Sequence, residues 1–211
     1  MRLTKFEHST LVLEKDGRRL IIDPGSFTAP FDPIDHVDAV VLTHEHPDHW
    51  TAEHLDRILT ASPDAQIFAP AALAMQAAPR RIDVVAPGDH RQAGPFALSF
   101  HGGRHAVIHP SIPVIDNVGV FVDGRLYYGG DSFDGPNAPV EILAVPAGAP
   151  WLKVSEVMDY VAALSPAQCF TVHEQVLSAA GLAMSRQRIA DVLPAGAVQH
   201  ALGTGDALEL G

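Results

Sequence analysis

Three histidines and an aspartate lie within one six-residue segment, His44-Glu45-His46-Pro47-Asp48-His49. The segment follows an apolar run at 39–42, which is typical of a short buried strand, so the histidines are expected on the loop at its carboxyl end. Imidazole nitrogen and carboxylate oxygen both suit a borderline metal ion such as zinc. A loop that is merely polar needs no such spacing. The segment therefore predicts a metal centre and, with it, a metalloenzyme.

A single loop cannot complete such a centre, so further ligands must come from other strand ends. Three residues of the right type follow predicted strands: His105, Asp131 and His173. Glycines at 102–103 and 129–130 stand just before the first two, and glycine lets the backbone approach an ion closely. These three residues are the candidates that complete the centre.

The elements that must position these side chains repeat along the chain. Two Asp-Gly pairs, at 16–17 and 123–124, each predict a hairpin, and an apolar strand and a helix follow each hairpin. Two similar halves of this kind favour two sheets back to back with helices outside. Strands are expected at 9–14, 19–22, 39–43, 66–69, 82–85, 95–101, 118–122, 126–128, 142–145 and 168–172, with two short ones within 197–210. One helix is expected to begin near residue 51, and three others are expected at 71–77, 154–164 and 185–192.

The composition indicates a single globular domain over residues 1–211. The chain is 47% hydrophobic and 18% charged, and its length can bury a sizeable core. A net charge of −11 argues against nucleic acid as a partner, because nucleic-acid binding draws on Lys and Arg. The single cysteine, Cys169, excludes an internal disulfide and is expected to be a buried, inert thiol. With no recognisable targeting segment or membrane-length apolar run, a cytoplasmic location without a membrane partner is expected.

Five motifs, taken in order, resemble those of the metallo-β-lactamase-fold superfamily of metal-dependent hydrolases. They are Asp23 after Leu20-Ile21-Ile22, the segment at 44–49, and then His105, Asp131 and His173. The resemblance covers essentially the whole chain. It implies an α+β fold, a four-layer αββα sandwich in which two mixed sheets carry helices on their outer faces.

The resemblance also implies two divalent metal ions and their ligands. Zinc is the first choice, with manganese and iron as alternatives. Asp23 would support the metal loop. The first ion would be held by His44, His46 and His105, and the second by Asp48, His49 and His173, with Asp131 bridging the two.

One branch of the superfamily is especially similar, the branch that includes the ascorbate-6-phosphate lactonase. The similarity lies in Glu7-His8-Ser9-Thr10, in Gly129-Gly130-Asp131-Ser132 and in the compact length. In that branch the early histidine lies near the metals, which makes His8 a candidate for substrate contact or proton transfer. Otherwise His8 is a strand-end histidine bonded to backbone.

The function implied is hydrolysis of a small ester, lactone or similar substrate by a hydroxide that both metals bind. Asp48 would orient the hydroxide and carry its proton to the leaving group, and His8 is a second candidate acid. The alternatives are a small phosphodiesterase on the same site, an iron-dependent oxidoreductase, and a metal-binding protein without catalytic activity.

The roles of three other residues are undecided from the sequence, and several further residues are assigned to the surface or away from the metals. Trp50 and Trp151 either wall a pocket or belong to the core, and His109 either approaches the substrate or lies on a loop. Glu45 and Glu174 are expected to point away from the metals. The sequence does not indicate an oligomeric state, and a homo-oligomer is open. Surface positions are expected for His36, His54, His90 and His200.

Overall fold

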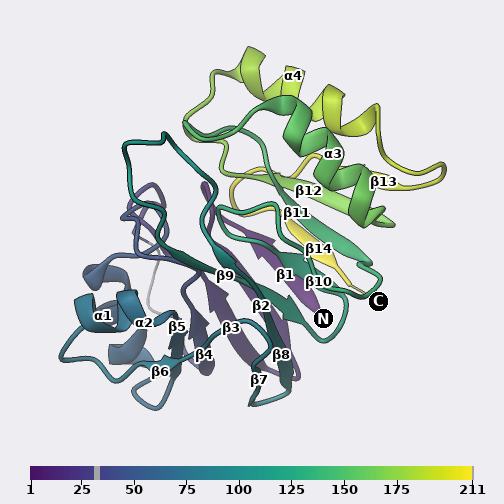
Figure 1. Cartoon of the computed structure of the whole chain (residues 1–211). Helices are drawn as coiled ribbons and strands as arrows, with labels where there is room; N and C mark the ends of the chain where they lie inside the picture. The colour runs from purple at the N-terminus through teal and green to yellow at the C-terminus, as the bar shows by residue number, and fades with distance from the viewer. Residues whose placement is uncertain (31–33, 211) are drawn as a thin grey trace.

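The computed structural model describes residues 1–30 and 34–210, which form two mixed sheets packed face to face between helices (Figure 1). Helices α1 (Ala52–Ala61) and α2 (Ala71–Gln76) cover the outer face of the first sheet. Helices α3 (Val154–Leu164) and α4 (Ala179–Ala190) cover the second. The four-layer αββα sandwich expected from the sequence is confirmed. No helix of the described segments combines the length and the apolar character that crossing a membrane requires.

The first sheet has the strand order β14-β1-β2-β3-β4-β5-β6. Neighbours from β14 to β3 are antiparallel, and those from β3 to β6 are parallel. The predicted hairpin turn joins β2 to β3, with Asp16 and Gly17 both at positive φ. The strands are β1 (Arg2–Lys5), β2 (Leu11–Lys15), β3 (Arg18–Ile22), β4 (Val37–Val41), β5 (Gln66–Ala69), β6 (Asp83–Val84) and β14 (Ala207–Glu209).

The second sheet repeats this plan in the order β13-β12-β11-β10-β9-β8-β7. Neighbours from β13 to β10 are parallel, and those from β10 to β7 are antiparallel. The shared plan agrees with the two similar halves that the paired hairpins indicate. The strands are β7 (His90–Ala93), β8 (Phe96–Arg104), β9 (Asp116–Val122), β10 (Leu126–Tyr128), β11 (Ile142–Pro146), β12 (Gln168–Val172) and β13 (Val198–His200).

Three hydrophobic cores hold the four layers together. The central core lies between the sheets and includes Leu20 and Phe100. The core beneath α1 includes Leu55 and Ile58, and the core beneath α3 and α4 includes Val161. Because each sheet is buried on both faces, its central strands are apolar at nearly every position, as parallel strands usually are.

Beyond small shifts in bounds, three elements differ from the sequence expectation. Strand β1 was not expected, because Arg2-Leu3-Thr4-Lys5 is short and mostly polar. Helix α4 begins at Ala179, where Ser178 caps it by accepting a hydrogen bond from the Gly181 amide, and not at residue 185. Most side chains of its first two turns are not buried, so they lack the apolar periodicity that marks a helix in a sequence. Strand β7 was not expected, because His90–Ala93 is a mostly polar strand at a sheet edge.

The topology brings several strand ends to one edge of the sandwich. In the first sheet β1 and β3 are both antiparallel to β2, and β4 is parallel to β3, so their carboxyl ends coincide. In the second sheet the same holds for β8, β10 and β12. The amide of Val118 donates to the Thr43 carbonyl (2.9 Å) and so joins the two edges. Every residue predicted to bind metal follows one of these strands.

Candidate metal centre

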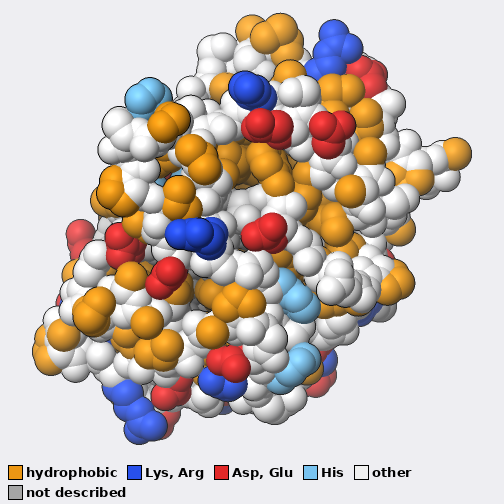
Figure 2. All heavy atoms as spheres, viewed as in Figure 1, with side chains coloured by type: hydrophobic (Ala, Val, Ile, Leu, Met, Phe, Trp, Pro, Cys, Tyr) orange, Lys and Arg blue, Asp and Glu red, His pale blue; other side chains and the backbone are white. Residues whose placement is uncertain are grey.

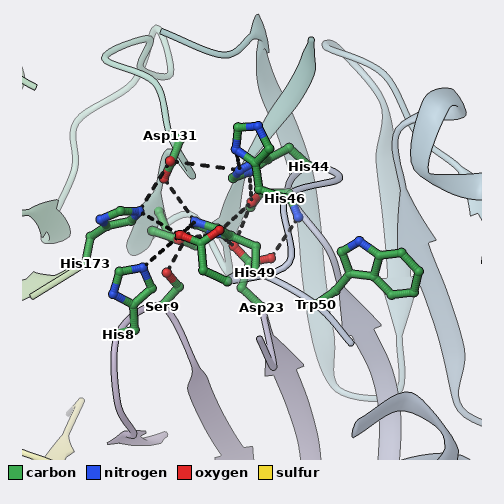
Figure 3. Close-up of polar contacts among 12 residues, drawn as sticks. His8, Ser9, Asp23, His44, His46, His49, Trp50, Asp131 and His173 are labelled. Carbon is green, nitrogen blue, oxygen red and sulfur yellow. Dashed lines mark hydrogen bonds and ion pairs between the residues drawn. The ribbon is translucent and has the colours of Figure 1, made fainter. Parts of the chain in front are cut away.

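All seven predicted ligands and His8 converge at this edge. Figure 3 shows six of these eight side chains close together: His8, His44, His46, His49, Asp131 and His173. They come from the loops that follow β1, β4, β8, β10 and β12. Their ligand atoms form two groups of four, and within each group all atoms lie within 4.8 Å of one another. One group is His44, His46, His105 and Asp131, and the other is His8, Asp48, His49 and His173.

The Asp131 carboxylate lies between the two groups. Its Oδ1 is 3.1 Å from Nε2 of His49, and its Oδ2 is 3.3 Å from Nε2 of both His105 and His173. Asp131 therefore contacts imidazoles from each group. This is the position that a bridging ligand needs, although bridging itself stays a prediction.

The imidazoles are oriented by hydrogen bonds on their far sides. Nδ1 of His105 donates to the Ala106 carbonyl (2.6 Å), and Nδ1 of His173 donates to the Gly148 carbonyl (2.7 Å). Nδ1 of His49 donates to Asp23 (2.7 Å). In a neutral ring a proton on Nδ1 leaves the Nε2 lone pair free, so each ring in its neutral form presents an acceptor to the centre.

Three buried atoms at the centre indicate that the residues fit a cation. Nε2 of His105, Nε2 of His173 and Oδ1 of Asp131 have no hydrogen-bond partner among the described residues, although both nitrogens lie 3.3 Å from Oδ2 of Asp131. An unpartnered buried polar atom costs about 1–3 kcal/mol. Unpartnered acceptors in both groups are explained by positively charged ligands, and this set of nitrogen and oxygen donors suits divalent metals.

The electrostatics of the centre lead to the same conclusion. Burial, followed by the charge of His49, lowers the pKa of His44 well below its usual value, which leaves a neutral imidazole. Burial also disfavours a charge on His49, but Asp131 and Asp23 outweigh it and raise the pKa of His49 well above its usual value. The ion-pair partners of Asp131 within the described residues are all histidines. The negative charge of Asp131 is therefore not compensated by a Lys or Arg side chain among the described residues.

Asp23 holds the loop at 44–49 in place. Its buried carboxylate accepts hydrogen bonds from the Thr43 amide (2.8 Å), from the Thr43 hydroxyl (2.6 Å) and from His49. The chain after Asp23 runs directly beneath the loop, and a Cβ at Gly25 would overlap the Asp48 carbonyl. Glycine is required there because the two backbones touch.

Asn117 holds the Asp131 loop, and sequence reasoning missed it. Its buried side chain donates to the Gly129 carbonyl (2.8 Å) and accepts from the Asp131 amide (3.1 Å). Gly130 has a φ of +62°, and a Cβ there would overlap Oδ1 of Asn117. The available signal was one amide side chain directly before the apolar strand predicted at 118–122.

A buried ion pair joins the first and last loops of the centre, and it too was missed. Nζ of Lys5, which is 1% exposed, donates to Oε1 of Glu174 (2.6 Å). The same oxygen accepts from the His8 amide (3.1 Å), and the His173 amide donates to the His8 carbonyl (3.0 Å). Glu174 lies outside both metal groups, as expected, but its role is to tie the loop after β1 to the loop after β12.

His8 is fully buried and contacts Asp48. Its Nδ1 accepts a long hydrogen bond from the Gln175 amide (3.4 Å), which places the proton of the neutral ring on Nε2. Nε2 then donates to Oδ2 of Asp48 (3.1 Å). The Phe27 ring packs edge-on against His8, with 4.8 Å between ring centroids.

The two tryptophans differ in their relation to the centre. Trp151 is buried, and its Nε1 donates to Oδ2 of Asp131 (2.8 Å). Trp50 is half-buried, is turned away from the imidazoles in Figure 3, and donates to the Glu45 carbonyl (3.2 Å). His109 is exposed and hydrogen-bonds to Ser111.

The positions expected for the remaining histidines and for Cys169 agree with the structure in part. His36 and His90 are exposed as expected, and His200 is half-buried and pairs with Gln168 (2.8 Å). The surface position expected for His54 is wrong: it is 5% exposed and donates to the Thr28 carbonyl (3.2 Å), because it lies on the buried face of α1. Cys169 is buried, and burial raises the pKa of its thiol to about 12.

Comparisons with known proteins agree with the geometry. The model of a family described as a β-lactamase superfamily domain matches residues 2–173. Protein Rv0786c of Mycobacterium tuberculosis is 39% identical over 184 residues, which are 84% of this chain and 86% of that protein.

Two solved structures share the fold. A proposed metal-dependent hydrolase from Parabacteroides distasonis has a TM-score of 0.75 at 19% identity, over 94% of this chain and 90% of that one. The diiron β-hydroxylase CmlA from Streptomyces venezuelae has a TM-score of 0.75 at 13% identity, over 99% of this chain and 54% of that one.

The Lys5–Glu174 pair generates a stability prediction. Lys5→Met leaves the Glu174 carboxylate without its cation in a largely buried place, so the free energy of unfolding should fall by about 3–5 kcal/mol. Lys5→Met combined with Glu174→Gln should lose less than the sum of the two single losses, because neither charge is then left alone. Urea unfolding measures all three variants. Glu53→Gln, which breaks an exposed pair with Arg57, is the matched control and should change stability several-fold less. Additive losses would show that the two charges do not depend on each other.

Proposed function

This chain belongs to the β-lactamase superfamily, and we propose that it is a metal-dependent hydrolase acting on a small ester or lactone. The observation that carries the proposal is the convergence of eight nitrogen and oxygen side chains in two groups, with buried acceptors that lack hydrogen-bond partners within the described residues. Two divalent ions suit the two groups, with zinc as the first choice.

When bound, such ions supply a nucleophile at neutral pH by lowering the pKa of a ligated water, and they polarise the oxygen of the bond that is cleaved. The protein's own contribution is to orient groups and to move protons. Substrate can reach Asp48, because its side chain is 23% exposed whereas His8 and His173 are buried, and His46 of the first group is also only half-buried. The Asp48 carboxylate can accept a proton there and pass it to the leaving oxygen.

His8 is the second group placed for proton transfer. Its Nε2–H donates to the oxygen of Asp48 that also lies 3.5 Å from Nε2 of His173. A donor in this position orients the Asp48 carboxylate while that group takes up a proton and passes it to the leaving oxygen. His8 therefore acts through Asp48 in this proposal, although it is also one of the four residues of the second group.

The surroundings of the centre favour an uncharged, partly apolar substrate. Four large hydrophobic side chains are 45–58% exposed on loops that follow strands of the site: Phe27, Val107, Ile112 and Val176. The chain carries a net charge of −11, and on the face drawn in Figure 2 the described Lys and Arg side chains lie singly among acidic ones. This surface is unsuited to nucleic acid, and a small molecule is the expected partner.

Two alternatives use the same residues. Two metals also stabilise the attacking and leaving oxygens of a phosphodiester, so a small phosphodiester is the second substrate class. Oxidative chemistry at iron is the other alternative, since the fold is shared with the diiron β-hydroxylase CmlA. The similarity of 7–10 and 129–132 to the ascorbate-6-phosphate lactonase branch favours the lactone.

Metal content tests the premise. The purified wild-type protein should bind about two divalent ions per chain, and Asp131→Ala should bind fewer because it lacks the carboxylate between the groups. Elemental analysis after dialysis measures both. Asp159→Ala, which changes an exposed aspartate of α3, is the matched control and should keep the wild-type content. A wild-type protein that binds no metal, even after incubation with zinc, manganese or iron, would contradict the proposal.

A substrate panel separates the alternatives. Zinc-loaded protein should hydrolyse lactones and short-chain nitrophenyl esters faster than bis(p-nitrophenyl) phosphate, and a chelator should abolish this activity. Turnover is measured as product release with each substrate in turn. Preference for the phosphodiester would make phosphodiester hydrolysis the function, and oxygen uptake by an iron-loaded form would favour oxidation.

His8→Gln tests the proton-transfer role. The variant should keep both metal ions and lose about 10²–10⁴-fold in kcat, since general acid–base groups contribute on that scale. Elemental analysis and steady-state kinetics are read together. His36→Gln, at an exposed histidine, should match the wild type in both. A His8→Gln protein that loses one metal ion is instead missing a ligand.

A further inference from the structure

Trp151 donates its only polar hydrogen to the carboxylate at the middle of the centre. The residue stands between β11 and α3, its side chain is 7% exposed, and its Nε1 lies 2.8 Å from Oδ2 of Asp131. A buried indole N–H normally finds an acceptor, but carbonyl groups usually serve. Here the acceptor is the charged group that contacts both sets of imidazoles.

The indole ring is also held against both metal groups. It packs edge-on against His105 of the first group, with 5.8 Å between centroids, and against His173 of the second group, with 6.3 Å. Phe133 packs against it at 5.2 Å. With rings on these sides, the indole cannot turn its N–H away from Asp131 without displacing a neighbour.

The hydrogen bond makes the two oxygens of Asp131 different. Oδ2 accepts from Trp151, whereas Oδ1 is buried 3.1 Å from Nε2 of His49 and has no hydrogen-bond partner among the described residues. A carboxylate without this donor could rotate and exchange its oxygens. The bond fixes Oδ1 toward His49 and Oδ2 toward His105 and His173.

We propose that Trp151 is a positioning residue that sets the orientation of the Asp131 carboxylate between the two metal groups, an inference that rests on the proposed function. Tryptophan suits the role because its indole nitrogen only donates and cannot itself bind a cation. A histidine or carboxylate at this position would add a competing ligand. A phenylalanine would fill much of the space but would leave Oδ2 without its donor.

Trp151→Phe tests the inference. Loss of a hydrogen bond to a metal ligand typically costs 10–100-fold in metal affinity, so at least one ion should bind about 10–100-fold more weakly. Zinc affinity and stoichiometry are measured by competition with a chromophoric chelator, and circular dichroism checks the fold. Trp50→Phe is the matched control: it removes the other indole N–H, which donates to a backbone carbonyl and not to a predicted ligand side chain, so it should change the affinities several-fold less.

A second measurement uses the wild-type chain and does not depend on how the variant folds. With ¹⁵N-labelled tryptophan, the protein gives two indole N–H signals by NMR, and the Trp50→Phe protein retains only that of Trp151. The Trp151 signal should exchange slowly with solvent and should shift as zinc is added, because its acceptor oxygen belongs to the centre. A role in packing alone predicts slow exchange but little response to zinc.

The outcomes distinguish failure of the positioning role of Trp151 from failure of the proposed metal-dependent function. A wild-type protein that binds no metal overturns the proposed function. A wild-type protein that binds two ions, together with a Trp151→Phe protein of equal affinity or a Trp151 signal indifferent to zinc, overturns only the positioning role. Weaker binding in Trp151→Phe, with a several-fold smaller loss in Trp50→Phe and a zinc-dependent Trp151 signal, supports it.

Discussion

The burial of the Asp131 carboxylate among imidazoles is the constraint on which the rest of the structure depends. A carboxylate removed from water costs several kcal/mol unless a cation faces it, and the ion-pair partners of Asp131 in the described part of the chain are histidines. The positive charge comes either from protons on these rings or from a metal ion that the rings bind. Folding and ligand binding are therefore linked at this residue, since whatever supplies the positive charge stabilises the folded state.

The same constraint explains why the centre lies where two sheets meet. The first half of the chain contributes the loop at 44–49, and the second half contributes His105, Asp131 and His173. Each half alone presents only part of a coordination set. Asp23 and Asn117 play parallel roles in the two halves, because each is a buried side chain that hydrogen-bonds the backbone beside a ligand. The repeated sheet plan places these two supports on facing edges.

The sequence was informative where structure is local and uninformative where contacts are distant. Strands β5, β10 and β12 and helix α3 match their predicted bounds, because apolar periodicity and turn residues determine such elements. Lys5 and Trp151 could not be assigned, because a lysine in a strand and a tryptophan in a loop acquire their roles only when Glu174 and Asp131 arrive from elsewhere. The buried His54 was missed for a related reason: its burial depends on how α1 lies on the sheet. Motif spacing predicted the residues that converge at the candidate centre, whereas tertiary packing determines which other residues support them.

The contact between Lys5 and Glu174 spans 169 residues of sequence, and this separation has a consequence for folding order. Contacts between distant segments form late, because the chain must close a long loop before it gains from them. During synthesis the loop at 44–49 emerges well before β12. The His8 amide therefore lacks its acceptor, Glu174, until the segment after β12 has been made. A nascent chain thus carries its histidine-rich loop before the centre is complete, and early metal capture at that loop would have to be compatible with the later docking of His173.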